Sequence, residues 1–293
     1  MHKINKNRNS KKNETSKNLA SKNSMWIYGK HAVRATLLNP KREVLRLILL
    51  ESNKNFLEDA ISANIHSELI ANSNISPEIV DANYFFSLFG RDATHQGCAV
   101  LVKKLEEMSL DDLIKDKSDD RPFIFLDQVT DPQNIGSVLR ASAVFDARAV
   151  VITADHSPEI TPTIAKTASG ALESVPLVHV VNLAQSINYL KEHGFWVVGL
   201  DERSEKELSE IDLHGKFIFI IGSEGTGMRR LTKEACDFVA QLPGSKVSAN
   251  NILNRSSTNS FTTLNAAQAA TVTLYESCRQ RQRKIREESN AKR

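Results

Sequence analysis

The first patterned region of this chain, residues 25–104, mixes helical and extended spacing of its apolar side chains. Residues 31–38, 53–63 and 81–89 carry apolar side chains with helical spacing, which predicts three helices. The run VLRLILL at 44–50 is rich in branched apolar residues and predicts a buried strand, and the shorter run at 98–102 predicts another. We therefore expect a small α/β unit here.

From Pro122 onward, short apolar runs alternate with segments of helical spacing. Strands that alternate with helices predict an α/β fold with a mostly parallel sheet, covered by helices on both faces. The predicted strands are 122–126, 148–153, 177–181, 195–200, 216–222 and 237–242, and the predicted helices are 134–145, 163–170, 183–193, 228–235 and about 264–282.

Polar and charged segments set the expected domain boundaries. Residues 1–24 are rich in Lys, Asn and Ser and predict a disordered tail. Residues 105–121 are highly charged and predict a linker with one short helix. We thus expect a tail at 1–24, a first domain at 25–104, a linker at 105–121, a main domain at 122–282 and a second tail at 283–293.

Charge is concentrated at the two ends of the chain. Residues 1–22 hold seven Lys or Arg and one Glu, a charge of +6, and residues 279–293 hold seven Lys or Arg and two Glu, a charge of +5. Because the whole chain carries +3, residues 23–278 carry −8. Basic arms neutralise phosphates and strengthen binding to nucleic acids. Solvated tails that only aid solubility fit the same charges equally well.

Composition argues against several other classes of protein. The chain is 41% hydrophobic, yet no apolar run approaches the roughly 20 residues that span a bilayer. Its start has no apolar core segment of a secretory signal. The three cysteines (Cys98, Cys236 and Cys278) are widely spaced and form no metal-ligand pattern. We therefore expect a cytoplasmic protein that neither enters a membrane nor binds a metal.

Three segments of the main domain have residues suited to chemistry. DQVTDPQNIGSVLRAS (127–142) places an asparagine and an arginine on a helix whose N-terminus suits an anion. IIGSEGTGM (220–228) follows a strand and holds three glycines, which predict a tight loop. Its spacing is GxxGxG rather than the GxGxxG of dinucleotide sites, and Glu224 would repel a phosphate. TLNAAQAATVTLYE (263–276) predicts a helix with small residues along one side.

Taken in order, these segments resemble the three motifs of the SpoU (TrmH) family of SPOUT RNA methyltransferases. NIGSVLRAS resembles the pattern NxGxxxRxA, GSEGTG resembles GxEGxG, and LP at 242–243 with TLNAA…LYE resembles the third motif. The segments YGKHAVRATL (28–37) and HQGCAV (95–100) resemble the RNA-binding domain of the RlmB-type 23S ribosomal-RNA guanosine methyltransferases. The resemblance covers roughly residues 25–280.

This resemblance implies a fold, a cofactor and partners. It implies a mostly parallel α/β domain with a C-terminal trefoil knot, preceded by an L30e-like RNA-binding domain. It also implies a homodimer that binds S-adenosylmethionine in the knot and 2′-O-methylates a guanosine of 23S ribosomal RNA. By motif position, the catalytic candidates are Asn134, Arg140, Glu224 and Asn265, and the cofactor candidates are Gly199, Leu200, Gly222, Leu242 and Leu264.

Arg140 is the family's candidate for the catalytic residue. A ribose 2′-hydroxyl must lose its proton as its oxygen attacks the methyl group, so a base and correct alignment both contribute to the rate. An arginine is almost always protonated, which makes it an awkward base. We expect Arg140 to hold the target phosphate and stabilise the developing alkoxide, with Asn134 and Glu224 orienting Arg140 and the ribose.

The third motif departs from the family pattern. Pro243 and Asn265 are 22 positions apart, roughly a dozen more than usual, so we expect an inserted loop at about 247–262. Ala267 also stands where the family has a serine. The insertion either bulges outward or weakens cofactor binding. Two alternatives therefore stay open: a weakly active or inactive dimeric RNA-binding protein, and a transfer-RNA 2′-O-methyltransferase.

Overall fold

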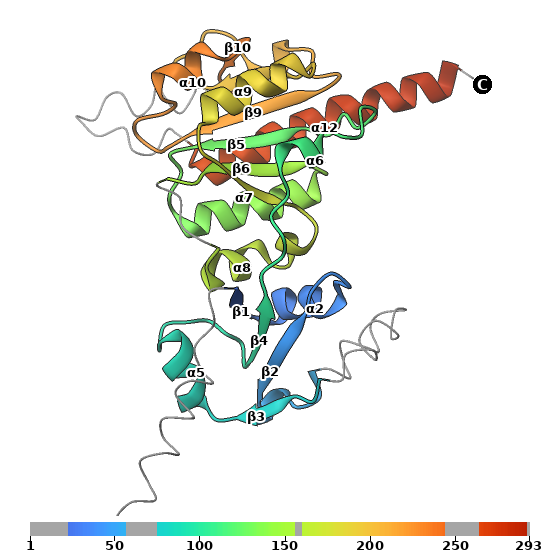
Figure 1. Ribbon diagram of the computed structural model, residues 1–293. Coiled ribbons are helices and arrows are strands. Elements are labelled where there is room, and N and C mark those ends of the chain that lie inside the picture. The colour runs from blue at the N-terminus through green and yellow to red at the C-terminus, as the bar shows by residue number, and fades with distance from the viewer. Residues whose placement is uncertain (1–22, 57–74, 156–159, 244–263, 292–293) are drawn as a thin grey trace, which may run out of the picture. The chain divides into compact units, whose positions relative to one another are not determined.

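The computed structural model describes residues 23–56, 75–155, 160–243 and 264–291 (Figure 1). These residues form two compact units that divide between Glu106 and Glu107. The predicted tail at 1–24, except for its last two positions, and most of the predicted helix at 53–63 lie outside the described residues. No helix in the described part of the chain is long and apolar enough to cross a membrane.

The first unit is a four-stranded sheet with helices beside it. Its sheet has the order β1-β4-β2-β3, in which β4 is antiparallel to both of its neighbours and β2 is parallel to β3. Strands β1 and β3 have no counterpart in the sequence-based prediction. The elements in chain order are β1 (Ser24–Tyr28), α2 (Lys30–Leu38), β2 (Val44–Leu50), the 3₁₀ turn η1 (Glu51–Asn53), β3 (Glu78–Val80), α5 (Ala82–Phe89) and β4 (Cys98–Lys103).

Aromatic side chains build the core of this first unit. Phe85 of α5 is fully buried and stacks on His95, whose pKa is lowered by burial. The N-terminus of α5 is capped by the Asp81 carboxylate, which accepts a hydrogen bond from the Tyr84 amide. The other large members of the core are Trp26, Tyr28, Ile48 and Leu101.

The second unit is built on a six-stranded sheet of order β10-β8-β9-β5-β6-β7. Every pair of neighbours in it is parallel, which confirms the predicted parallel α/β architecture. Helices cover both faces of a parallel sheet, so successive side chains of each strand are buried and apolar. The continuous apolar runs therefore predicted these strands. The strands are β5 (Phe123–Asp127), β6 (Ala149–Thr153), β7 (Leu177–Val180), β8 (Trp196–Leu200), β9 (Phe217–Gly222) and β10 (Phe238–Ala240).

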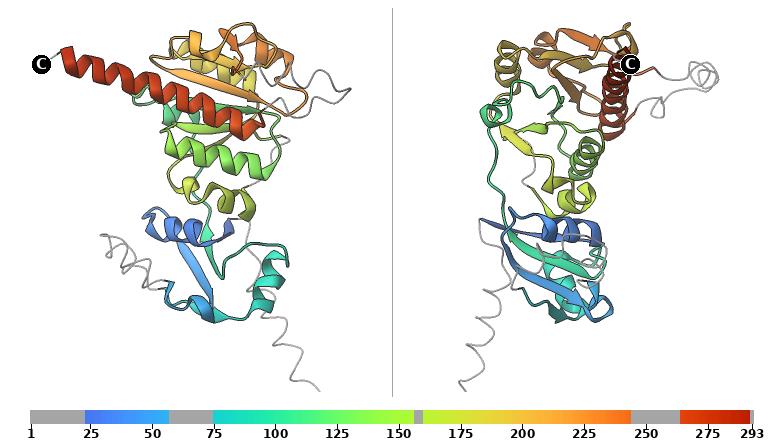
Figure 2. Two further views of the ribbon diagram at one scale, coloured as in Figure 1. Left: turned by 180° about the vertical axis from the view of Figure 1, so that it is seen from behind. Right: turned by 90° about the vertical axis from the view of Figure 1, so that its right-hand side faces the viewer.

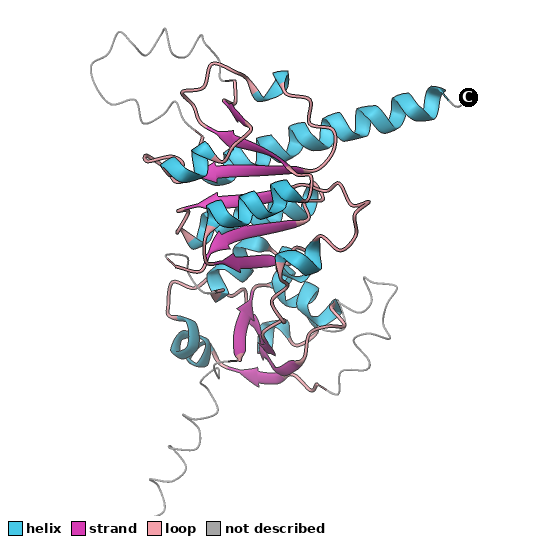
Figure 3. Ribbon diagram, turned by 45° about the horizontal axis from the view of Figure 1, so that its top comes forward, coloured by secondary structure: helices cyan, strands magenta, loops and turns pink. Residues whose placement is uncertain are grey.

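Helices cover both faces of the sheet (Figure 3). On one face, α9 (Leu183–Glu192) packs on the core and contacts α10 (Arg230–Glu234). On the other, α7 (Pro132–Val144) contacts α8 (Pro162–Ala168) and α12 (Ala266–Ala291). Short 3₁₀ turns at 171–173 (η2) and 208–210 (η3) complete this unit.

A glycine permits the close approach of α7 and α8. A Cβ atom added to Gly136 would lie 2.6 Å from the Cβ of Thr167 and 2.9 Å from the carbonyl oxygen of Ile164. Such distances are well below ordinary van der Waals contact, so any larger residue would push the two helices apart. The glycine in the first motif therefore serves the packing that positions α7.

The segment predicted as a linker, 105–121, packs for most of its length on the second unit. Its short helix α6 (Leu110–Leu113) contacts the core beneath α9. The buried Arg148 guanidinium donates to the carbonyl oxygens of Leu113 and Asp119 and lies 3.1 Å from the Asp119 carboxylate. Two of its acids pair with basic groups of the domain, Asp119 with Arg148 and Glu107 with His179. Charge patterning alone does not distinguish such a segment from a solvated linker.

The last helix continues beyond its predicted end. We expected it to stop near Gln282 and a basic tail to follow at 283–293, but α12 extends to Ala291. Its last turns project away from the body of the second unit, as the left view of Figure 2 shows. The expected inserted loop at 247–262 lies outside the described residues.

Candidate functional site

Four neighbouring strands end at the same edge of the large sheet. β10, β8, β9 and β5 are adjacent and parallel, so their carboxyl ends lie side by side, which is where open α/β sheets bind ligands. Gly199 of β8 pairs with Val239 of β10, and Gly222 of β9 pairs with Asp127 of β5. The cofactor candidates Gly199, Leu200 and Gly222 are therefore gathered along this edge. Leu242, another candidate, comes two residues after β10 and is half-buried.

The loop after β9 folds back on itself. Ser223 and Gly227 form an antiparallel bridge, in which the Gly227 amide donates to the Ser223 carbonyl oxygen at 2.9 Å. Gly227 has φ of 70°, the left-handed region that favours glycine. A Cβ atom on Gly222 would lie 2.3 Å from the carbonyl carbon of Gly227, so only glycine fits at this strand end.

An ion pair between the buried Asp127 and the partly exposed Arg229 ties the far end of this loop to β5. The Asp127 carboxylate is fully buried, and its oxygens accept hydrogen bonds from the Arg229 amide at 2.8 Å and from Arg229 Nε at 2.6 Å. Sequence reasoning placed Asp127 at the start of the first motif but did not single it out. The signal was present, since a carboxylate that directly follows a buried strand must find a partner.

We expect Arg229→Gln to lower the free energy of unfolding by roughly 2–3 kcal/mol, because it leaves the buried Asp127 carboxylate without its charged partner. The neighbouring Arg230→Gln is the matched control, since Arg230 is exposed and pairs with Glu234 one helical turn away. Urea denaturation of both variants checks the difference. Equal stabilities of the two variants would contradict the assignment, and Asp127→Asn should reduce the loss caused by Arg229→Gln.

A groove lies where the N-termini of α7 and α12 meet the glycine loop. Its cavity volume is about 720 Å³. Across it, the Asn134 side chain donates a hydrogen bond to the Glu224 carboxylate at 3.0 Å, which joins two motif positions that are 90 residues apart. The groove thus brings together Asn134, Glu224, Asn265 and Leu264 from the predicted set, and its remaining walls are Asp131, Gln133, Ser137, Ala267, Gln268, Thr271 and Val272.

The N-terminus of α7 is already capped by the protein itself. The Asp131 carboxylate accepts hydrogen bonds from the amides of Gln133 and Asn134. These are the amides that an anion would use at a helix N-terminus, and the carboxylate would repel a phosphate there. The expectation that this helix end suits an anion is therefore wrong.

Asn265 has a structural role that the motif did not reveal. Its side-chain oxygen accepts from the Gln268 amide at 2.8 Å, and the Gln268 side-chain oxygen accepts from the Asn265 amide at 3.1 Å. This reciprocal pair is a capping box that begins α12. The asparagine therefore fixes the start of the helix that forms one wall of the groove, and its side-chain NH₂ group can still donate.

Arg140 does not line the groove. It is exposed on α7, six residues beyond Asn134. Six residues of α-helix correspond to about 9 Å along the axis and to about 120° around it. The structure therefore brings Asn134 and Glu224 together and leaves the arginine of the same motif on an adjacent face of the helix.

Burial makes two thiols in the described residues unreactive. Burial raises the pKa of Cys98 and of Cys236 to about 12, which keeps both protonated near neutral pH. Within the described ranges, no group of three or more His, Cys, Asp or Glu side chains is placed to hold a metal ion.

Comparisons with known proteins show what this chain is similar to. The model of the SpoU rRNA Methylase family matches residues 121–275. The chain is 34% identical over 259 residues to the 23S rRNA (guanosine-2′-O-)-methyltransferase RlmB of Pseudomonas putida, covering 87% of this chain and 96% of that protein. It is 36% identical over 262 residues to the RlmB of Pseudomonas syringae pv. tomato, covering 88% and 96%. In fold, it is similar to the SpoU methyltransferase AviRb of Streptomyces viridochromogenes, solved in complex with AdoMet, with a TM-score of 0.69, 19% identity and 94% of each chain covered.

Proposed function

Since this chain belongs to the SpoU rRNA methylase family, we propose that it transfers a methyl group from S-adenosylmethionine to the ribose 2′-hydroxyl of a guanosine in 23S ribosomal RNA. One observation of the structure carries the proposal. Asn134, Glu224 and Asn265, one residue from each of three separate motifs, converge on a single groove. Ribosomal RNA is favoured over transfer RNA because the relatives aligned over most of this chain are named for 23S rRNA.

The edge of the sheet fits S-adenosylmethionine. The cofactor needs backbone hydrogen-bonding groups and an apolar surface for its adenine ring. Gly222 is the last residue of β9, Gly199 is the buried penultimate residue of β8, and Leu200 and Leu242 are half-buried apolar side chains that end or follow β8 and β10. We assign these four residues, with Leu264, to cofactor binding. When bound there, S-adenosylmethionine supplies a methyl group activated by its sulfonium.

Arg140 acts on the RNA rather than on the cofactor. A general base must be deprotonated before it can remove a proton, whereas a guanidinium is almost always protonated. This permanent charge favours the role of a phosphate clamp, with the guanidinium also stabilising charge that develops on the ribose oxygen. The hydrogen-bonded pair of Asn134 and Glu224 then orients the ribose in the groove.

We also propose that the protein acts as a homodimer. Large apolar side chains stay exposed on α7 and α12, two helices that contact each other, although single exposed side chains are common on monomers. Val144 is 69% exposed, Tyr275 54% and Val272 41%. Together they support a surface that a second copy would cover.

Other features of the family complete the proposal. We assign a trefoil knot to the C-terminal part of the second unit and an L30e-like RNA-binding role to the first unit. The mixed four-stranded sheet with flanking helices supports the second assignment. We further propose a cytoplasmic location, where ribosomal RNA is available, and a reaction that needs no metal.

The decisive experiment is transfer of a labelled methyl group from S-adenosylmethionine to unmodified 23S rRNA, mapped by a readout sensitive to 2′-O-methylation. We expect labelling at one guanosine ribose. Labelling of transfer RNA alone would favour the transfer-RNA alternative. No labelling of either RNA by a folded protein would favour an inactive RNA-binding protein.

Cofactor affinity separates the enzyme from that inactive alternative. We expect S-adenosylmethionine to bind in titration calorimetry with the loop at 247–262 present, and a variant with that loop shortened should keep this affinity. Salt-dependent binding of RNA without measurable binding of the cofactor would instead support the inactive protein. Recovery of cofactor binding in the shortened variant would then identify the loop as the cause.

A further inference from the structure

The last helix is clamped where it leaves the sheet. The Gln280 side chain accepts a hydrogen bond from the Leu213 amide at 2.9 Å and donates one to the Ile211 carbonyl oxygen at 3.2 Å. On the next residue, the Arg281 guanidinium donates to the Phe145 carbonyl oxygen at the end of α7. Two side chains thus hold the helix to two separate segments of the second unit.

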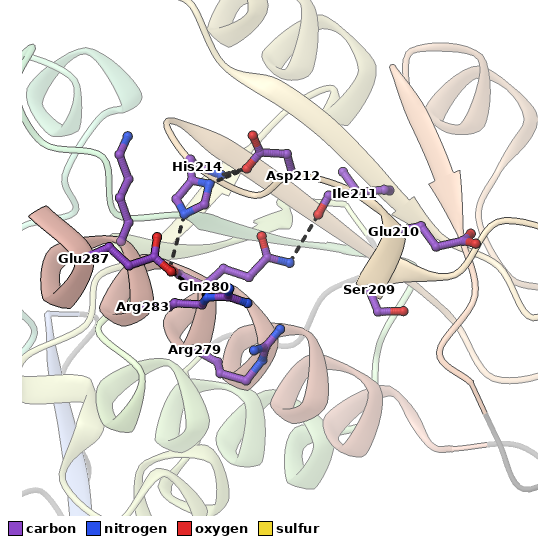
Figure 4. Close-up of a pocket in the computed structure, with 10 residues that line it drawn as sticks. Ser209, Glu210, Ile211, Asp212, His214, Arg279, Gln280, Arg283 and Glu287 are labelled. Atoms are coloured by element: carbon purple, nitrogen blue, oxygen red, sulfur yellow. Dashed lines mark hydrogen bonds and ion pairs between the residues drawn. The ribbon is translucent and has the colours of Figure 1, made fainter.

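Figure 4 shows the bond from Gln280 to Ile211 in this clamp. The clamp lies beside a hollow of about 320 Å³ between α12 and residues 209–214. The His214 ring bridges the two sides of the hollow, with Nδ1 against the Asp212 carboxylate and Nε2 3.2 Å from the Gln280 carbonyl oxygen. Because the helix is held at this point, the part beyond it has a defined direction. A flexible tail, which the sequence predicted here, would have none.

Three arginines share one face of the projecting helix. Arg279, Arg283 and Arg286 are spaced four and three residues apart, which places them within about 60° of one another around the axis. All three are exposed, and the Arg283 side chain is 73% exposed. From first to last they span about 10 Å along the helix axis. Three successive phosphate intervals along one strand of a nucleic-acid duplex cover about the same length. We call Arg279, Arg283 and Arg286 the arginine stripe.

The arginine stripe continues a line that begins in the groove. Val272 lines the groove, and Arg279 and Arg286 follow it at intervals of seven residues on nearly the same side of the helix. The distance from Val272 to Arg286 along the axis is about 21 Å. One helix face therefore leads from the wall of the proposed active site to a set of exposed cations.

We propose that the arginine stripe binds the phosphate backbone of the RNA substrate outside the active site. This proposal rests on the proposed function for the identity of the RNA. The contact needs no base recognition, because guanidinium groups on a helix face pair with phosphates of any sequence. It strengthens binding in proportion to the counterions released, and it guides the strand toward the groove.

Acidic neighbours do not block this role. Arg279 pairs with Glu276 and Arg283 with Glu287, at 2.8 Å in both cases, while Arg286 is exposed. Exposed ion pairs at such spacings contribute little to stability. A phosphate can therefore displace each carboxylate. Charge complementarity favours RNA because residues 279–293 carry +5 in total.

The test uses the full chain and unmodified 23S rRNA transcribed in vitro. The variant carries Arg279→Gln, Arg283→Gln and Arg286→Gln, because glutamine keeps the helix propensity and removes the charge. The matched control removes three exposed charges elsewhere in the second unit by Lys115→Gln, Lys117→Gln and Arg230→Gln. RNA affinity is measured against salt from about 50 to about 200 mM.

We expect the stripe variant to lose about two units from the slope of log affinity against log salt, at about 0.7–0.9 per lost contact, while the control keeps the wild-type slope. Its turnover at saturating RNA should equal that of the wild type. An unchanged slope, or an equal decrease in the control, would overturn the proposal. So would a change in oligomeric mass by sedimentation, which would make the stripe a contact between copies. If the wild type transfers no methyl group but the slopes still differ, the proposed function fails and the RNA-binding surface remains.

Discussion

Arg140→Ala should lower the turnover of methyl transfer by about 10²–10³-fold while leaving the affinity for S-adenosylmethionine nearly unchanged. The magnitude is that of removing one group that stabilises charge in a transition state. The cofactor is spared because Arg140 projects from an exposed position of α7, away from the ends of β8, β9 and β10. Single-turnover transfer to 23S rRNA and calorimetric titration of the cofactor measure the two quantities.

Arg140→Lys separates the two chemical roles of this residue. As a phosphate clamp, a lysine should restore part of the activity and leave the pH profile of turnover unchanged, because both side chains are protonated near neutral pH. As a base, a lysine would lose its proton at a lower pH than arginine, so the rise of turnover with pH would move to lower pH. A large loss of cofactor affinity in Arg140→Ala would refute both roles.

Gly222→Ala should lower the affinity for S-adenosylmethionine by at least about tenfold and destabilise the fold by about 1–3 kcal/mol. The added methyl group would meet the backbone of Gly227 and Met228 at 2.3–2.5 Å, so the loop that follows β9 must move. Backbone atoms cannot rotate out of the way as a flexible side chain can. Cofactor titration and urea denaturation check the two effects.

Gly215→Ala is the control at the opposite end of the same strand. Gly215 has φ of 108°, so alanine is strained there, but nothing lies within 4 Å of the added atom. It should destabilise the protein by about 1–2 kcal/mol and keep the wild-type cofactor affinity. Wild-type affinity in a folded Gly222→Ala variant would remove this strand end from the cofactor site.

The large sheet was predictable because its strands appear in the sequence as continuous apolar runs. β9 reads as FIFIIG, an uninterrupted apolar run, since both of its faces are buried beneath helices. β3, with only three residues and exposed side chains, carries no such pattern and was missed. The end of α12 was misplaced because its last turns gain little from burial and are stabilised within the helix, for example by the pair of Arg283 and Glu287.

The site was only partly predictable, because motifs give the kinds of residue and not their partners. Asn134 and Glu224 were expected to orient Arg140 and the ribose, and their hydrogen bond to each other could not be read from the motifs. The capping role of Asn265 depends on Gln268 and on where α12 begins. The spacing of six residues places Arg140 about 120° around α7 from Asn134, but only the fold shows which face of α7 lines the groove. The pairing of Asp127 with Arg229 joins residues 102 apart and requires the fold itself.

The order in which the groove is assembled has a consequence for the synthesis of the protein. Its walls come from the start of α7, from Glu224 and from the start of α12, and contacts between such distant segments form late in folding. A nascent chain that ends before residue 264 contains the start of α7 and Glu224 but lacks α12, so one wall of the groove is missing. The first unit can fold as soon as it emerges, because domains generally fold as units during synthesis. Incomplete chains would therefore lack the groove, so any RNA they bind would stay unmethylated.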